Sequence, residues 1–299
     1  MANACVFCGD SSQRLTDEHV MADWIGKDFG QIPTGISQIT NAKGELTQWP
    51  SAPFSDVVKI VCQDRCNGGW MSDLEAAVKP ILGPMMTRGW VTTLSAPTQQ
   101  TLAFWAVKTA LVIEHLHPRH RVVGDSEYGG LFAAQQPLPT HVVWIGRRNS
   151  PGDNLVSSLK ESLNRIQVPA DNHKMTQAIR QATDNGARMY RFTFSIGHVV
   201  FQVFGHNIPM TLQIEGGTGF HDVVQQIWPP KSDVTWPPPK SVESVGGTEG
   251  LHRAWGSTSR PTPEPSDETV PEPRNRAEKR AASRRKPAGQ QYKRTQKRK

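Results

Sequence analysis

The chain has 299 residues, of which 36% are apolar, and a formal net charge of +7. This apolar fraction is low for a fully globular chain, which indicates that part of it is unfolded. The most apolar run, residues 101–116, contains Lys108 and Glu114 and is too short to cross a bilayer. No N-terminal segment has the pattern of a signal peptide. These features exclude an integral membrane protein and favour a soluble, cytoplasmic protein without a membrane partner.

The positive charge is concentrated at the C-terminal end of the chain. Residues 272–299 contain 12 of the 34 Lys and Arg residues but two of the 27 acidic residues. The rest of the chain therefore carries 22 basic and 25 acidic residues, a balance of −3. We expect affinity for an acidic partner in this tail and not over the whole folded body.

The first predicted element is a cysteine knuckle, CVFCG, in which Cys5 and Cys8 are separated by two residues. A second knuckle, CQDRC, uses the remaining cysteines, Cys62 and Cys66, with three residues between them. In a reducing compartment four cysteines favour metal ligation over disulfides. Two knuckles present four thiolates in pairs, as tetrahedral zinc requires, so we predict one structural zinc ion. The competing interpretation is four buried thiols without a metal.

The stretch LTDEHV, residues 15–20, adds a candidate for proton transfer. Histidine is the usual general base at neutral pH, so His19 is the candidate, and Glu18 offers oxygen to a hard cation. Adjacent strand residues point to opposite faces, so both can serve one site only where the strand ends or bends. Asn67 directly follows Cys66 and supplies another oxygen ligand. A zinc ion that joins the knuckles would draw Asn67 towards Glu18 and His19.

A helix is predicted after the second knuckle. Gly68 and Gly69 weaken a helix that begins at Asn67, so the start is expected at Ser72, where Ser72 and Glu75 match a capping box. Pro80 is expected to kink the helix, and Gly83-Pro84 is expected to end it.

Residues 85–228 form a second block of mixed character. A buried helix is predicted near residues 98–116, and Gly197 suggests a tight hairpin between two strands. His198 and His206 flank a strand and are expected at the surface. The further predicted elements are a hairpin at 36–49, strands at 140–146, 190–196 and 198–204, and helices at 153–164 and 173–184.

Residues 229–299 contain 11 of the 23 prolines and almost no periodic apolar pattern. Such a segment cannot bury enough apolar surface to offset the entropy of ordering, so we predict a disordered Pro-rich linker and a basic arm. The arm is interpreted as a phosphate-contacting segment whose affinity falls with salt, with Arg284, Arg285 and Lys286 among its contacts. The alternative is a solvated tail that only aids solubility.

The motifs CVFCG, LTDEHV and VCQDRCNGGWMSDLE together resemble the four-cysteine branch of the HNH endonucleases, which is common in bacteria and their phages. The resemblance covers residues 5–82 and implies a treble-clef-like ββα-metal fold. It implies that His19 activates water, and that Glu18 and Asn67 hold one Mg²⁺ or Mn²⁺ ion. It further implies hydrolysis of phosphodiester bonds in double-stranded DNA, leaving a 5′ phosphate and a 3′ hydroxyl.

The sequence departs from the family pattern at several positions. Many members have a proline three residues after the histidine, where this chain has Ala22. The middle asparagine of the signature has no clear counterpart, and Asn41 and Asp56 are the two candidates. Asp17 competes with Glu18 as the carboxylate ligand. The missing asparagine normally braces the loop that holds the histidine, so its absence affects the expected rate more than the fold.

The predicted fold is α+β in three segments: a zinc-stapled HNH-like domain at 1–84, an α+β region at 85–228, and the tail at 229–299. Two alternatives to a nuclease stay open, a catalytically silent zinc-structured nucleic-acid-binding protein and a phage assembly or scaffold protein. The predicted phosphate contacts near the site are Arg14, Lys27 and Arg65.

Overall fold

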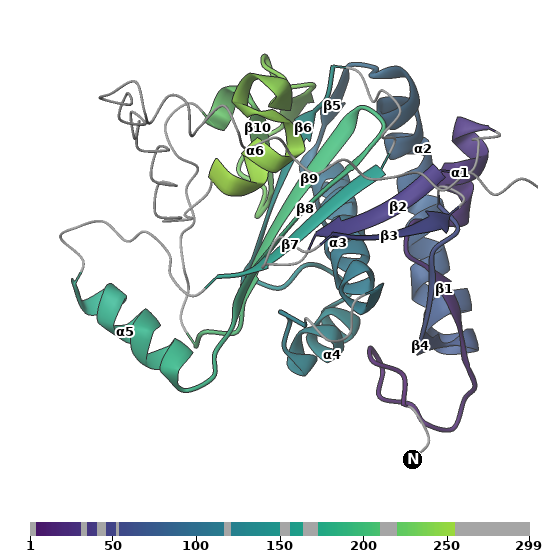
Figure 1. Ribbon diagram of the computed structural model, residues 1–299, viewed down its shortest axis with the longest axis vertical. Helices are drawn as coiled ribbons and strands as arrows, with labels where there is room; N and C mark the ends of the chain where they lie inside the picture. Colours follow the sequence, from purple (N-terminus) through teal and green to yellow (C-terminus); the bar gives the residue numbers. More distant parts are fainter. Residues whose placement is uncertain are drawn as a thin grey trace, which may run out of the picture. The chain divides into compact units, whose positions relative to one another are not determined.

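The computed structural model in Figure 1 describes residues 4–30, 35–40, 46–51, 54–116, 121–149, 156–163, 173–209 and 220–254. The chain divides into two compact units, Met1–Ser257 and Thr258–Lys299. The second unit, with Arg284, Arg285 and Lys286, lies outside the described residues, so its role stays a prediction. The first unit contains helices and antiparallel sheets, which confirms the mixed α+β class.

Two antiparallel strands connect the N-terminal segment with the second cysteine knuckle. β1 (Leu15–His19) pairs with β4 (Val57–Cys62), in a register that sets Leu15 opposite Cys62 and His19 opposite Val57. The register shifts between Thr16 and Glu18, and such a bulge re-aims side chains locally. The hairpin predicted at 36–49 is confirmed by β2 (Gly35–Thr40) and β3 (Leu46–Ser51), while its turn lies outside the described residues.

The second knuckle continues into a wide-turn helix, η1 (Gln63–Met71), and then into α2 (Ser72–Arg88). η1 is kinked at Gly69, which has a non-helical backbone with φ −99° and ψ −120°, two residues before its end. A Cβ atom on Gly69 would lie 2.9 Å from the carbonyl oxygen of Asp64, so a larger residue does not fit there. The predicted start at Ser72 is confirmed. The predicted capping box is wrong, because no side chain caps this helix.

The predicted end of α2 at Gly83-Pro84 is also wrong, because the helix runs past both prolines. Leu82, Met85 and Met86 extend its buried face, and α2 packs against the next helix. Burial of these side chains offsets the hydrogen bonds that Pro80 and Pro84 remove. The helix ends at Gly89, which adopts φ +64° and donates its N–H to the Met85 carbonyl at 3.0 Å.

A single buried helix, α3 (Ala96–Ile113), lies between α2 and a five-stranded antiparallel sheet (Figure 1). It is buried continuously from Leu102 to Ile113, as its apolar composition predicts. One hydrophobic cluster contains the cysteines, α2, α3 and the inner face of the sheet, so the predicted boundary at residue 84 does not separate two cores. The sheet order is β10-β6-β9-β8-β7, formed by β6 (His141–Arg147), β7 (Val156–Ser162), β8 (Met189–Ile196), β9 (Val199–His206) and β10 (Val224–Trp228).

The opposite face of the sheet is covered by the segment that follows it. β11 (Val234–Trp236) pairs with β5 (Thr92–Leu94), and η5 (Val242–Val245) and α6 (Gly247–Ala254) close over a second cluster. The predicted disorder from residue 229 is therefore wrong for residues 229–254. Three of its apolar side chains, Trp236, Val242 and Leu251, are each 0% exposed, and their burial stabilises the segment although its overall composition is polar. The remaining elements are α1 (Asp23–Phe29), η2 (Glu114–Leu116), α4 (Asp125–Ala134), α5 (His173–Asp184) and η4 (Phe220–Asp222).

The helix predicted at 153–164 is wrong, since these residues contain β7. Lys160 reaches Glu114 at 2.9 Å on one face of the sheet, and Glu161 pairs with Arg191 on the other. The apolar residues of this segment are spaced as in a helix, but its pairing with β8 stabilises a strand instead. His206 is buried and not at the surface. In the part of the chain described, no helix combines the length and apolar character needed to cross a bilayer.

Candidate metal centre

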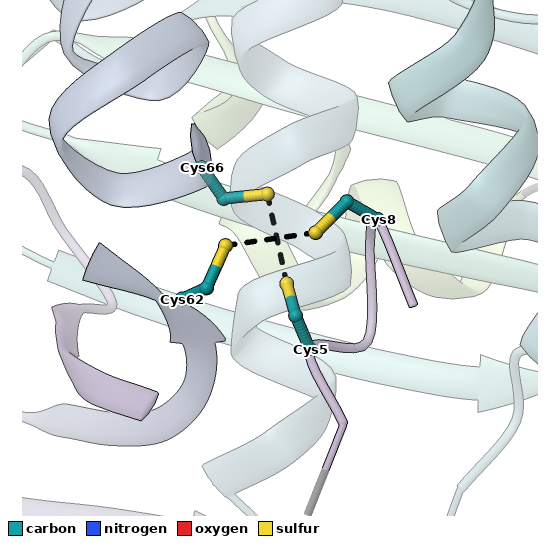
Figure 2. A group of neighbouring side chains, drawn as sticks. All are labelled: Cys5, Cys8, Cys62 and Cys66. Carbon is teal, nitrogen blue, oxygen red and sulfur yellow. Dashed lines mark hydrogen bonds between the residues drawn. The ribbon is translucent and has the colours of Figure 1, made fainter. Parts of the chain in front are cut away.

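Four cysteine side chains from two distant segments converge on one point, as Figure 2 shows. Their sulfur atoms all lie within 4.8 Å of one another. The Sγ atoms of Cys5 and Cys66 are 3.6 Å apart, and those of Cys8 and Cys62 are 3.5 Å apart. Sulfurs bonded to tetrahedral zinc at about 2.3 Å would be about 3.8 Å apart. The predicted cluster is confirmed, and its geometry could hold a structural metal such as zinc.

Backbone pairing explains why segments more than 50 residues apart meet here. The N–H of Val6 donates to the carbonyl of Ile60 in β4 at 3.0 Å, which docks the first knuckle on the strand that leads into the second. The first knuckle closes on itself through Gly9, whose N–H donates to the Cys5 carbonyl at 2.9 Å and whose φ is +72°. A left-handed backbone at this point favours glycine. The two knuckles are thus held by strand geometry as well as by their sulfurs.

The four cysteines influence the pKa values of one another. The sulfur–sulfur hydrogen bond with Cys66 lowers the pKa of Cys5 to about 4, although burial opposes this. The same contact, together with burial, raises the pKa of Cys66, and burial raises that of Cys62. Four thiolates at this separation repel one another unless a cation compensates them, and metal binding is what releases their protons.

Aromatic rings cover the second knuckle. Trp70 stacks on Phe104 with 5.4 Å between ring centroids and meets Phe7 edge-on at 5.5 Å. The buried Nε1–H of Trp70 has no oxygen or nitrogen partner among the described residues. Its interaction with the Cys66 sulfur favours the thiolate form of that cysteine. An N–H group that supports a thiolate is a common neighbour of a metal-bound cysteine, so this otherwise unpaired donor also fits a metal site.

The second knuckle lies next to the end of β1. Nδ2 of Asn67 donates to the backbone oxygen of Asp17 at 3.1 Å. This contact brings Asn67 to within one residue of Glu18 and two of His19 along the strand. The amide oxygen of Asn67 has no partner among the described residues. It is therefore available to accept a hydrogen bond or to bind a cation.

Glu18 differs from what the sequence predicts, because it has a protein cation as its partner. Its side chain is 6% exposed, and its Oε1 accepts a hydrogen bond from Nζ of Lys108 at 3.1 Å. The same Nζ donates to Oε1 of Glu75 at 2.8 Å. Burial alone would lower the pKa of Lys108, but the charges of Glu18 and Glu75 outweigh it, and the pKa lies above its usual value. The two carboxylates thus favour the ammonium form of Lys108, and Oε2 of Glu18 has no partner within the described ranges.

His19 is half-buried at the end of β1, and its ring has neither a hydrogen bond nor an ion pair among the described residues. The N–H of the next residue, Val20, donates to the carbonyl of Asp56 at 2.9 Å. Asp56 therefore lies beside the histidine, whereas Asn41 is outside the described residues. Asp17 is exposed at the bulge and stays the alternative carboxylate.

The predicted phosphate contacts have different surroundings. Arg14 is exposed and has no ion pair in the described part of the chain. Lys27 is exposed and forms an ion pair with Asp23 on α1. The guanidinium of Arg65 lies 4.9 Å from the centroid of the Phe132 ring, so part of its function is to pack the knuckle on α4.

Sequence reasoning missed Lys108 and Glu75 as neighbours of Glu18. The available signal was a lysine in the middle of an otherwise apolar helix, because a buried ammonium needs an acidic partner. No family model, curated protein or solved structure matches the chain. The arrangement contains a closed sulfur cluster and, next to it, a histidine, two carboxylates and an amide at a strand end, which are the groups needed for proton transfer and for binding a hard cation.

Proposed function

We propose that the protein is an HNH-type endonuclease that hydrolyses phosphodiester bonds in DNA. The observation that carries this proposal is the 3.1 Å hydrogen bond from Asn67 to the backbone of Asp17. It joins the residue after the last cysteine to the strand end that carries Glu18 and His19. The antiparallel β1–β4 pair followed by α2 is compatible with a ββα-metal fold.

In this proposal His19 is the general base. A half-buried imidazole that has no hydrogen bond or ion pair among the described residues can accept a proton from a water molecule aligned with the scissile phosphate. The cysteine cluster holds β4 and the second knuckle in place, so that Asn67 and the end of β1 keep their relative position. Because the groups are already held in position, the reaction does not incur the entropic cost of bringing them together.

A divalent ion would be held by Oδ1 of Asn67 and by a carboxylate oxygen. Glu18 is the preferred carboxylate because its Oε2 is unengaged among the described residues, and Asp17 is the alternative. When bound, Mg²⁺ or Mn²⁺ would stabilise negative charge on the phosphate and on the leaving oxygen. Asn67 and Glu18 would hold the positive charge of the ion beside His19, and this charge would orient the phosphate of the substrate.

A second candidate function, binding of nucleic acid without cleavage, is favoured by one specific observation. Lys108 already neutralises part of the Glu18 charge, and the His19 ring has no group that orients it within the described residues. A site with these properties could keep the zinc-dependent structure while its chemistry is lost. The two functions differ in one measurable result, which is cleavage.

The test is incubation of the zinc-loaded full chain with supercoiled plasmid and either Mg²⁺ or Mn²⁺. The nuclease proposal predicts nicked or linear product from the unaltered protein and none above background from His19→Ala. The zinc content of both proteins is measured, and it should be equal because His19 is not a sulfur ligand. His198→Ala is the matched control, and it should cleave normally. If His19→Ala retains full activity, the proposed mechanism is wrong.

A further inference from the structure

Lys108 is the only fully buried lysine among the described residues. It lies in the middle of α3, in the second block, and its side chain is 0% exposed. It contacts one carboxylate from β1 and one from α2, at 3.1 Å and 2.8 Å. An isolated ammonium at this depth is strongly unfavourable, so the two carboxylates are what keep it charged. A residue outside 1–84 thus contacts Glu18, the residue that precedes His19 on β1.

The charges of this triad do not balance. By formal charge, two carboxylates and one ammonium give the triad one net negative charge. Each carboxylate uses a single oxygen, Oε1, to bind Lys108. The triad therefore fixes the orientation of Glu18, while Oε2 of Glu18 has no partner among the described residues and the formal charge stays negative.

We propose that Lys108 is a positioning residue of the candidate site, which holds the Glu18 carboxylate and sets the charge that a divalent ion meets beside His19. This inference rests on the proposed function. It assigns to α3, and so to the region beyond residue 84, a direct part in organising the site. One hydrophobic cluster spans both blocks and holds α3 in the same core as α2, so the contact from Lys108 to Glu18 lies within one folded body.

A purely structural ion pair makes a different prediction from a positioning residue. Loss of a structural pair weakens folding, ion binding and cleavage together. Loss of a positioning cation increases the negative charge at the site while it releases the carboxylate. Ion binding should then become tighter as cleavage becomes slower, and that opposite movement cannot come from partial unfolding.

The experiment measures binding of Mn²⁺ to the zinc-loaded full chain, from the electron paramagnetic resonance signal of the free ion, together with plasmid cleavage at saturating Mn²⁺. For Lys108→Met we expect Mn²⁺ binding about tenfold tighter, since a positive charge a few ångströms away is removed. We expect cleavage at least about tenfold slower, since Glu18 is no longer fixed. Weaker or unchanged Mn²⁺ binding by folded Lys108→Met overturns the inference.

A second variant keeps the test decisive if Lys108→Met does not fold. Glu75→Gln leaves Lys108 to Glu18 alone and makes the pair neutral, so Mn²⁺ binding should weaken about tenfold. Asp73→Asn is the matched control, because it removes an exposed charge from the same helical turn without touching Lys108. If Glu75→Gln behaves like Asp73→Asn, the inference is overturned. If the unaltered protein neither binds Mn²⁺ nor cleaves, the proposed function itself is wrong, and the inference falls with it.

Discussion

Removal of the metal should destabilise the folded unit far more than loss of a few surface contacts. Three of the four cysteines are almost fully buried, with exposed fractions of 2% for Cys5 and 0% for Cys62 and Cys66. Without a metal, the cluster retains two sulfur–sulfur hydrogen bonds, at 3.5 and 3.6 Å. A typical hydrogen bond contributes about 1 kcal/mol, whereas structural zinc contributes on the order of 10 kcal/mol or more in small zinc domains.

The expected shift follows from these magnitudes. Even half of the zinc contribution, about 5 kcal/mol, lowers the melting temperature of a unit of this size by about 10–20 °C. Because the cysteines share one cluster with α3, the loss should not be confined to residues 1–84. The assay is thermal unfolding followed by near-ultraviolet circular dichroism, before and after chelation, with zinc measured by mass spectrometry. We expect one zinc per chain and a clear loss of the near-ultraviolet signal on chelation.

Cys8→Ser gives the same test by mutation, because Cys8 is half-buried and serine is close to it in size. Ser11→Ala, at an exposed position three residues further along the chain, is the control and should melt like the unaltered protein. A chelated protein that keeps its melting temperature within a few degrees and its near-ultraviolet spectrum would refute the reasoning, since the four thiols would then be sufficient without a metal.

Two further predictions concern pH and the tail. Burial lowers the pKa of His252 to about 3, and the charges of Arg191 and Arg253 add to the effect. In the unfolded chain a histidine titrates near 6.5. Below pH 6.5 the unfolded state therefore binds more protons than the folded state, so the stability present above that pH falls as the pH decreases towards 3. From pH 6.5 to 4.5 this histidine contributes a loss of about 2 kcal/mol, which urea unfolding should detect and His252→Gln should remove. An unchanged pH dependence in that variant would count against the burial argument. Deletion of residues 272–299, with their 12 basic residues, should weaken DNA binding at low salt and flatten its salt dependence; binding with the same salt slope would show that the tail makes no phosphate contacts.

The parts of the fold that could be predicted are those with a local physical signal. The cysteine spacing predicted the cluster, because tetrahedral sulfur coordination needs that pairing. The apolar run at 101–116 predicted α3, and Gly197 predicted the β8–β9 hairpin, in which it adopts φ +54°. The glycine pair after Asn67 predicted the late start of α2. Each signal lies within one short stretch of chain.

The failures came from interactions between distant segments. α2 continues through two prolines because its last turns are buried against α3 and α1. Residues 156–162 form a strand because β8 offers an edge, although their apolar spacing suits a helix. Residues 229–254 are ordered because Trp236 enters the core and donates to the Gly146 carbonyl at 3.1 Å. None of these partners can be recognised from the segment alone.

In the candidate site, too, the contacts that follow from a local pattern could be predicted and those between distant segments could not. The sequence predicted that Asn67 would approach the end of β1, because two knuckles joined by one ion leave little freedom. It did not predict that Glu18 would pair with Lys108, because the lysine is 90 residues away in a different block. Long-range pairing thus changed the interpretation of Glu18 from a free ligand to one held by the protein.

The most direct test of the central claim compares the initial rate of plasmid cleavage by the unaltered protein and by His19→Ala, at equal zinc content and with Mg²⁺ or Mn²⁺ present. We predict cleavage that depends on the divalent ion in the first protein and none above background in the second. Equal rates in the two proteins, or no cleavage by either, would contradict the assignment of a nuclease site to this strand end.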